Sequence, residues 1–315
     1  MRRLLPACLI VLAPLVSAAA TSCPTIDAFG DFAALAAATA NTPDAERLAR
    51  FNRDFVARYA ALYEPNAIGL APGPALDAAA LSDLQGAELP KASALDATLR
   101  RVLADVTTRL ANAFPDFRCD FPIWIAPTFG QLDGAGRVVA GKPSLILGPD
   151  VIARFETDDQ LPVFVSHELF HRYHDQAAGF SDDLAERDLI WRALWAEGLA
   201  TYASARLNPA RTLADALLLP RDLQQRADPL VPALAAELAR SLDDVDPAVF
   251  SLFFKYGDTH AKQLGRPWRS GYYMGYLVAR RLGTHRTLPE LAHLQGPALR
   301  REIGDALAEM ATEPR

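Results

Sequence analysis

The 315-residue chain lacks several features that direct proteins to particular functions. It has no internal repeat and no low-complexity tract, which argues against solenoids and other repeat architectures. Basic residues are in the minority, with 32 Lys and Arg against 38 Asp and Glu and a formal net charge of −6. This balance argues against nucleic acid as a partner, because nucleic-acid-binding proteins carry basic patches. The apolar fraction of 50% is typical of a globular protein with a buried core.

Long apolar runs are also absent after the N-terminus. No later stretch reaches about 18 uninterrupted apolar residues, so we expect no transmembrane helix. The N-terminus has the layout of a secretory signal peptide: Arg2 and Arg3, an apolar stretch from Leu4 to Val16, and small residues at 17–20. We therefore expect residues 1–20 to be removed and the mature protein to be periplasmic or secreted.

Cysteine is scarce, with 3 in the whole chain. Cys8 falls in the predicted signal peptide, which leaves Cys23 and Cys119 in the mature protein. In an oxidising compartment, two cysteines most simply form one disulfide. The alternative is that Cys23 is the lipidated first residue of a bacterial lipoprotein. The residues before it fit that signal poorly, because a leucine is usual three positions before the cysteine, so we favour the disulfide.

Helical periodicity dominates the first third of the chain. The pattern from Asp27 to Tyr63 is helical, with Thr42 as an N-cap, and Leu95 to Phe114 places apolar residues on one helical face. Aromatic residues recur every four positions in the first region and are expected in the core: Phe51, Phe55, Tyr59 and Tyr63.

Two short runs of strand-forming residues follow, at 121–126 and 144–148, and glycines separate them. They predict neighbouring strands. The sequence after Pro149 is helical nearly to its end. The predicted fold class is therefore α+β, mostly helical, with one small sheet. A helical region would cover 21–114 and a second region 115–315, and the two could pack as one unit.

An H-E-x-x-H motif begins at His167 and ends at His171, inside a predicted helix from about Asp159 to Ala177. Residues four apart share one helical face, with Cβ atoms about 6 Å apart, so both imidazoles can bind one metal ion. Zinc lowers the pKa of a bound water to about 7, and Glu168 is placed to take its proton as general base. Apolar neighbours indicate a buried helix, where such a cluster needs a partner. We predict one zinc ion (Zn²⁺) per chain.

A catalytic zinc site normally has three protein ligands and one open position. His174 is a candidate for the third, but three histidines on one helix would give poor tetrahedral geometry. Glu197 is the better candidate, because it lies in a second apolar helix where an unpaired carboxylate is costly. The structural alternative for Glu197 is a salt bridge to Arg192 or another basic residue.

The H-E-x-x-H motif, followed 26 residues later by E-G-L-A-x-Y at Glu197 to Tyr202, resembles the gluzincin superfamily of zinc metallopeptidases. The chain is also similar to small predicted bacterial Zn-dependent proteases that continue with G-Y-x-x-G-Y, which stands here at Gly271 to Tyr276. The resemblance implies a gluzincin-like fold with the sheet packed on the motif helix. It implies that His167, His171 and Glu197 bind zinc, that Glu168 is the base, and that the substrate is a peptide or protein.

One position departs from the gluzincin pattern. Many members carry an aspartate four residues after the glutamate ligand, where it orients the first histidine, and this chain has Thr201 there. Another outer partner must hold His167, since a weak one would loosen the metal. Asp182, Asp183 and Asp188 are the candidates.

The G-Y-x-x-G-Y segment also has meaning without the resemblance. Gly271 and Gly275 are one helical turn apart, which allows close helix packing, and Tyr272 and Tyr276 are likewise one turn apart. Either hydroxyl could stabilise the oxyanion of a tetrahedral intermediate, with His260 behind them. Helix packing alone is the structural alternative.

We expect the strand at 144–148 to lie at the sheet edge, where an extended peptide substrate would pair with it through main-chain hydrogen bonds.

The sequence therefore predicts an exported zinc metallopeptidase. The alternatives are a non-catalytic cell-envelope binding protein that retains the fold, which the missing aspartate favours, and a helical envelope protein without metal. The intact Glu168 argues against the first alternative, because a structural metal site needs no base.

Overall fold

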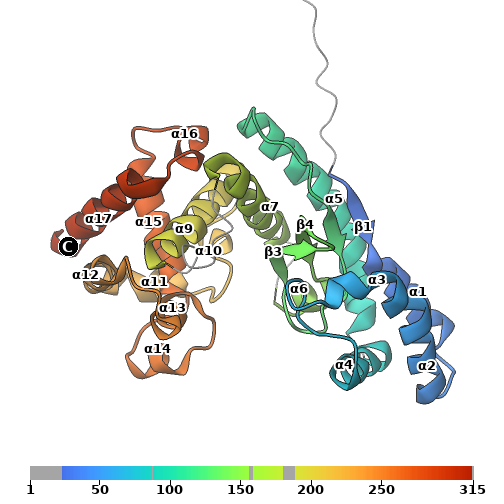
Figure 1. Ribbon diagram of the computed structural model, residues 1–315. Helices are drawn as coiled ribbons and strands as arrows, with labels where there is room; N and C mark the ends of the chain where they lie inside the picture. Colours follow the sequence, from blue (N-terminus) through green and yellow to red (C-terminus); the bar gives the residue numbers. More distant parts are fainter. Residues whose placement is uncertain (1–22, 87, 156–158, 180–188, 314–315) are drawn as a thin grey trace, which may run out of the picture.

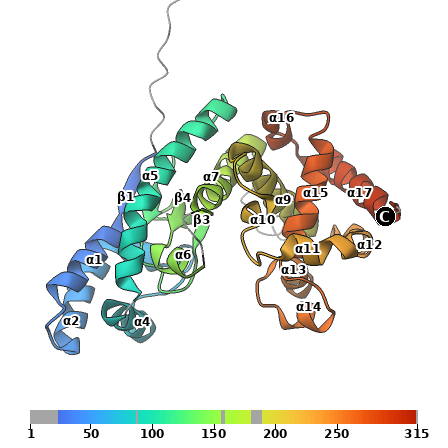
Figure 2. The same cartoon turned by 180° about the vertical axis from the view of Figure 1, so that it is seen from behind.

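The computed structural model describes residues 23–86, 88–155, 159–179 and 189–313. The fold is mostly helical with one four-stranded sheet, which confirms the α+β prediction. The predicted signal peptide, residues 1–20, lies outside the described residues. Two groups of helices lie on either side of a central pair, α7 (Leu161–Ala178) and α9 (Ile190–Leu207), as Figures 1 and 2 show from opposite sides.

The sheet lies in the N-terminal half and has the order β1-β2-β4-β3. Its strands are β1 (Thr25–Asp27), β2 (Ile123–Ile125), β3 (Gly134–Val139) and β4 (Lys142–Leu147). Strand β2 pairs in parallel with both β1 and β4, whereas β3 runs antiparallel to β4. The two predicted strands are therefore neighbours, as expected.

Strand β3 corrects the prediction that 144–148 forms the sheet edge. Strand β4 is internal because it pairs with β2 on one side and β3 on the other, so its main-chain groups are already used. The edge strands are β1 and, beside β4, β3. The two glycines of β3, Gly134 and Gly136, were expected to lie between strands. Glycine is unfavourable in strands unless another element approaches closely, and here both glycines face α7.

The N-terminal helices pack around the predicted aromatic stripe, which is buried together with Phe32 and Phe129. Their elements are α1 (Ala28–Ala38), α2 (Asp44–Arg50), the π-helix η1 (Phe51–Val56), α3 (Ala57–Tyr59), the 3-10 helix η2 (Ala60–Tyr63) and α4 (Pro74–Gln85). The predicted cap at Thr42 is wrong. Helix α2 begins at Asp44 after Pro43, and the Thr42 hydroxyl donates to the Thr39 carbonyl instead.

Helix α5 (Leu89–Ala113) packs against α7 and against α6 (Pro149–Phe155), which follows β4. The helix starts six residues before the predicted Leu95, because Pro90 is well suited to a first turn. Cys23 and Cys119 form the predicted disulfide, which joins the chain ahead of β1 to the chain ahead of β2. The Cys23 sulfur is therefore bonded to Cys119, which argues against a lipid anchor at Cys23.

Short helices and three longer ones make up the C-terminal half. They are α10 (Leu213–Ala216), α11 (Leu223–Ala227), the 3-10 helix η3 (Asp228–Leu230), α12 (Val231–Ser241), α13 (Pro247–Phe254), α14 (Thr259–Gln263), α15 (Ser270–Leu282), α16 (Leu288–Ala292) and α17 (Gly296–Thr312). Across the described ranges, no helix has the length and apolarity needed to cross a membrane.

Helices α9 and α15 touch backbone to backbone at two glycines. A Cβ atom added to Gly198 would overlap the main chain of Gly275, and one added to Gly275 would lie 2.7 Å from the Gly198 Cα. The predicted small-residue approach at Gly275 is therefore present. Gly198 directly follows Glu197, and Gly275 lies one turn after Tyr272. This contact therefore determines how close the side chains of Glu197 and Tyr272 lie to each other.

We expect Gly275→Ala to lower the free energy of unfolding by about 1–3 kcal/mol, because the added methyl group must push two packed helices apart. Gly304→Ala is the matched control. Its nearest neighbours would lie 3.6 Å away, and alanine favours the helix by about 1 kcal/mol. Urea unfolding followed by circular dichroism measures both variants. Equal midpoints for the two would show that the α9–α15 contact is not tight.

Candidate metal centre

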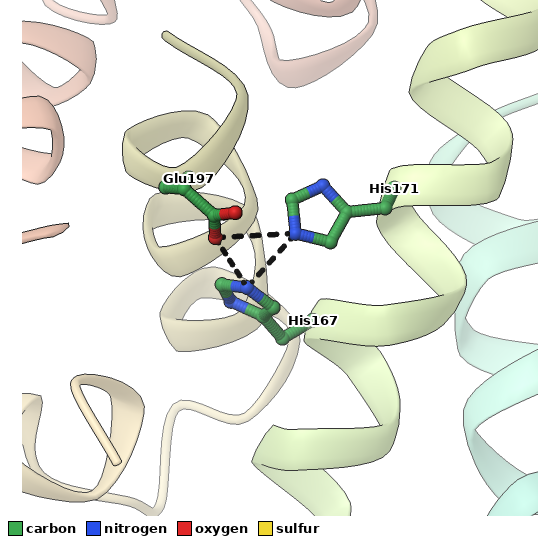
Figure 3. A group of neighbouring side chains, drawn as sticks. All are labelled: His167, His171 and Glu197. Carbon is green, nitrogen blue, oxygen red and sulfur yellow. Dashed lines mark hydrogen bonds and ion pairs between the residues drawn. The ribbon is translucent and has the colours of Figure 1, made fainter. Parts of the chain in front are cut away.

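The H-E-x-x-H motif lies in the middle of α7. Pro162 is at the first turn of this helix, and Gly179 ends it in the left-handed conformation at φ 57°, as glycine does at many helix C-termini. The helix is buried along most of its length, with His167 buried and His171 partly exposed. Both imidazoles point toward α9, which runs beside α7 and carries Glu197 (Figure 3).

Three donor atoms from these two helices form a nearly equilateral triangle. The Nε2 atoms of His167 and His171 are 3.0 Å apart, and the Glu197 carboxylate oxygen Oε2 lies 3.1 Å from the first and 3.3 Å from the second. The side chains of His171 and Glu197 are 21% and 25% exposed, so the triangle faces solvent on that side. The structure thus brings together the three residues that the sequence marks as ligands.

The triangle suits a tetrahedral metal ion. Zinc binds histidine nitrogen and carboxylate oxygen at about 2.0–2.2 Å, which places tetrahedral donors about 3.3 Å from each other. The observed separations of 3.0, 3.1 and 3.3 Å are close to that spacing. Three donors from two rigid helices would leave the fourth position for a water or a substrate, as catalytic zinc sites do.

The ionisation of the three groups also fits a cation site. Burial of the Glu197 carboxyl would raise its pKa, but the charge of His171 and hydrogen bonds from both imidazoles hold the pKa well below its usual range. Burial would lower the pKa of His171, yet Glu197 raises it to about 9. Burial lowers the pKa of His167 to about 4. A neutral imidazole and a carboxylate are ready to bind metal, and the proton on His171 would leave when an ion binds.

His174 does not join this cluster. Its ring packs against Phe170 with centroids 5.5 Å apart, and burial lowers the pKa of His174 to about 3. Arg192 lies over the Trp191 ring, while Glu197 pairs with the two histidines. The geometry therefore favours Glu197 over His174 as third ligand, and favours the histidines over Arg192 as its partners.

The outer partner of His167 differs from the gluzincin pattern, as the sequence suggests. Thr201 is buried, and its hydroxyl donates 2.8 Å to the main-chain oxygen of Glu197. The Nδ1 atom of His167 is buried, and no acceptor in the described ranges lies within hydrogen-bonding distance. Asp182, Asp183 and Asp188, the predicted substitutes, lie outside the described residues.

Glu168 sits between the cluster and the edge of the sheet. A Cβ atom added to Gly134 would lie 2.7 Å from Glu168 Cγ, so the first residue of β3 is in contact with this side chain. Burial raises the pKa of Glu168 to about 8, with the charge of His171 opposing the shift and that of Asp133 adding to it. A divalent cation at the triangle would lower that pKa. Glycine at position 134 is what lets the strand come this close.

The two candidate tyrosines have different surroundings. The Tyr272 ring stacks on that of His167 at an angle of 22°, with centroids 6.1 Å apart. Burial raises the pKa of Tyr272, and the charge of Glu197 adds to this shift. Tyr276 packs against Tyr202 and lines a separate cavity of about 470 Å³. His260 is exposed at the start of α14. Tyr272 is therefore the tyrosine at the cluster.

Sequence reasoning missed Arg269. Its guanidinium lies 3.8 Å from the centroid of the Tyr272 ring, and its charge acts on His167 and Glu168. The only available signal was an arginine three residues before a candidate tyrosine, which is too common a pattern to single out a site.

We expect mature protein purified without added zinc to carry about one zinc per chain by elemental analysis. His171→Ala and Glu197→Ala should each weaken zinc affinity by more than the about 10–100-fold that loss of an outer partner costs. His285→Ala, at an exposed histidine, is the matched control and should keep the metal. Zinc retained by Glu197→Ala would place the third ligand elsewhere.

Comparisons of the chain with protein-family models, with curated proteins and with solved structures found no match.

Proposed function

We propose that this chain is an exported zinc-dependent metallopeptidase of the gluzincin type. The observation that carries the proposal is the triangle of donor atoms from His167, His171 and Glu197, with Glu168 beside it on the same helix. A structural metal site has no need of an adjacent carboxylate, whereas hydrolysis requires a base at that place.

A zinc ion held by the three donors would polarise a scissile carbonyl and acidify a water molecule. Glu168 takes the proton from the attacking water and then delivers it to the leaving amine. In this proposal Tyr272 donates a hydrogen bond to the oxyanion that forms on the carbonyl, a role in which a fixed donor lowers the barrier. Each of these groups lies on a helix, so little reorganisation is needed during the reaction.

An extended substrate fits beside β3. The strand is at a sheet edge and begins at Gly134, which contacts Glu168, so a peptide that pairs with it would pass the proposed base. A groove of about 940 Å³ lies between β3 and the C-terminal half of α7, lined by Gly136 and Arg172 among others. Farther along the strand, the main-chain nitrogen of Val138 donates to Asn66, so pairing with a peptide would use the Gly134 end.

A second candidate function is a non-catalytic binding protein with this fold. The observation in its favour is the buried Nδ1 of His167 without an acceptor in the described part of the chain, because outer partners tighten metal sites. Metal content and turnover separate the two functions.

Replacing the base tests the peptidase directly. We expect Glu168→Gln to keep about one zinc per chain and to lose about 10²–10⁴-fold in turnover, since the amide cannot accept a proton. Cleavage of a proteome-derived peptide library, identified by mass spectrometry, provides the substrates and then the rates. Unchanged turnover in this variant would contradict the mechanism, and absence of cleavage by the zinc-loaded parent would contradict the function.

The tyrosine pair offers a matched comparison one helical turn apart. We expect Tyr272→Phe to lower kcat by about 10²–10³-fold, because an oxyanion donor is lost without loss of the ring. Tyr276→Phe removes the same hydroxyl from the neighbouring cavity and should change kcat little. Steady-state kinetics on one library-derived peptide measures both. The reverse order of effects would assign the oxyanion role to Tyr276.

A further inference from the structure

Arg269 is held in an unusual position at the start of α15. Its backbone is in the left-handed region at φ 59°, which is unfavourable for a residue with a side chain. Its Nη1 atom donates 3.1 Å to the main-chain oxygen of Leu219, and the preceding residue, Leu218, also has a positive φ of 60°. Backbone strain of this kind persists where the surroundings require it, and it clusters at binding and active sites.

The guanidinium belongs to the same site as the donor triangle. It covers the Tyr272 ring at 3.8 Å, and that ring in turn stacks on His167. The charge of Arg269 reaches Glu168 as well. The side chain is partly exposed, so a bound molecule can touch it.

Among the residues that the structure describes, Arg269 makes no ion pair within 4 Å, although the charges of Glu197 and Asp133 act on it from farther away. Glu197, the carboxylate nearest to the cluster's centre, pairs with the two histidines at 3.1 and 3.3 Å. The guanidinium contacts a neutral carbonyl, that of Leu219, and the side chain of Tyr272. No described carboxylate therefore bonds directly to its N–H groups, and an added carboxylate would make charge-assisted hydrogen bonds with them.

The N–H donors along the edge of a guanidinium are well matched to a carboxylate. Arginine has five N–H donors in a planar fork that fits both oxygens of a carboxylate, and the carbonyl of Leu219 occupies one end of that fork. Because the Tyr272 ring covers its face, a ligand must approach in the plane of the guanidinium.

We infer that Arg269 binds a carboxylate of the substrate, so that this site acts on peptides with a negative charge close to the scissile bond. The carboxylate would be the C-terminal one or an Asp or Glu side chain. This inference rests on the proposed peptidase function and adds to it the class of substrate.

Four variants of one short peptide distinguish the sources of the carboxylate. One pair differs only in a free or amidated C-terminus, and a second pair, both amidated, carries Glu or Gln after the scissile bond. We expect the parent enzyme to favour a carboxylate by about 10- to 100-fold in kcat/KM, mainly through KM, as charged hydrogen bonds do. The pair that shows the preference identifies the source.

Arg269→Gln should abolish that preference, and Arg269→Lys should retain part of it, since lysine keeps the charge without the fork. Arg280→Gln is the matched control, because Arg280 lies over Tyr276 of the same helix, with its Cζ atom 5.7 Å from the ring centroid. This control should leave the preference unchanged. Equal losses on charged and neutral peptides, confined to kcat, would overturn the inference and assign Arg269 to the oxyanion.

Binding gives a readout that needs no turnover. In the Glu168→Gln background, calorimetry compares two carboxylate probes, N-acetyl-dialanine and the α-amide of N-acetyl-glutamate, with a neutral probe, the amide of N-acetyl-dialanine. Each probe is measured with and without Arg269→Gln. We expect a carboxylate preference that requires Arg269. If zinc-loaded parent protein cleaves peptides but shows no such preference, the inference fails and the peptidase stands. If nothing is cleaved while Arg269 still selects the carboxylate, the peptidase fails and the anion site stands.

Discussion

The contact between one carboxylate and two imidazoles determines how the centre of this protein is arranged. Glu197 lies 3.1 and 3.3 Å from the ring nitrogens of His167 and His171, at the junction of two largely buried helices. Polar groups in such a place must satisfy one another or bind an ion, because burial without a partner is costly. Helices α7 and α9 must therefore cross at one fixed register, since a shift by one residue would turn a ligand away from the triangle.

That register is reinforced from the far side of α9. The backbone contact between Gly198 and Gly275 brings α15 directly against α9, and it lies next to Glu197, the candidate ligand. The same contact brings Tyr272, one turn earlier on α15, against His167. The glycines that let the helices touch therefore also set the distance from the candidate oxyanion donor, Tyr272, to the donor triangle.

Local patterns predicted the parts of the site that depend on one helix. The pairing of His167 with His171 follows from a four-residue spacing, and Glu197 is conspicuous as a carboxylate in an apolar helix. Contacts between distant segments were not predictable in this way. The edge position of β3 depends on which strands pair, and Tyr272 and Tyr276 share a stripe, so only the placement of α15 separates them.

Arg269 is another residue whose place at the site could not be predicted from the sequence. No periodicity marks it, and its position depends on a left-handed turn and on the carbonyl of Leu219, 50 residues earlier in the chain. Thr42 is not a cap, because helix α2 begins one residue later, after Pro43, and no helix N–H group donates to a side chain there. Strained turns depend on neighbours that lie far away in the sequence.

The site is assembled from a row of packed elements that runs through both halves of the molecule. Strand β3 contacts α7, α7 contacts α9, and α9 contacts α15. Glu168, the proposed base, lies on α7 and contacts β3, whereas Tyr272 and Arg269 lie at or next to α15 in the other half (Figures 1 and 2). A peptide bond between Glu168 and Tyr272 would therefore be held from two sides. Neither half alone supplies all the residues proposed as base, metal ligands and oxyanion donor, and under this proposal the two halves have a functional reason to share α7 and α9 at their junction.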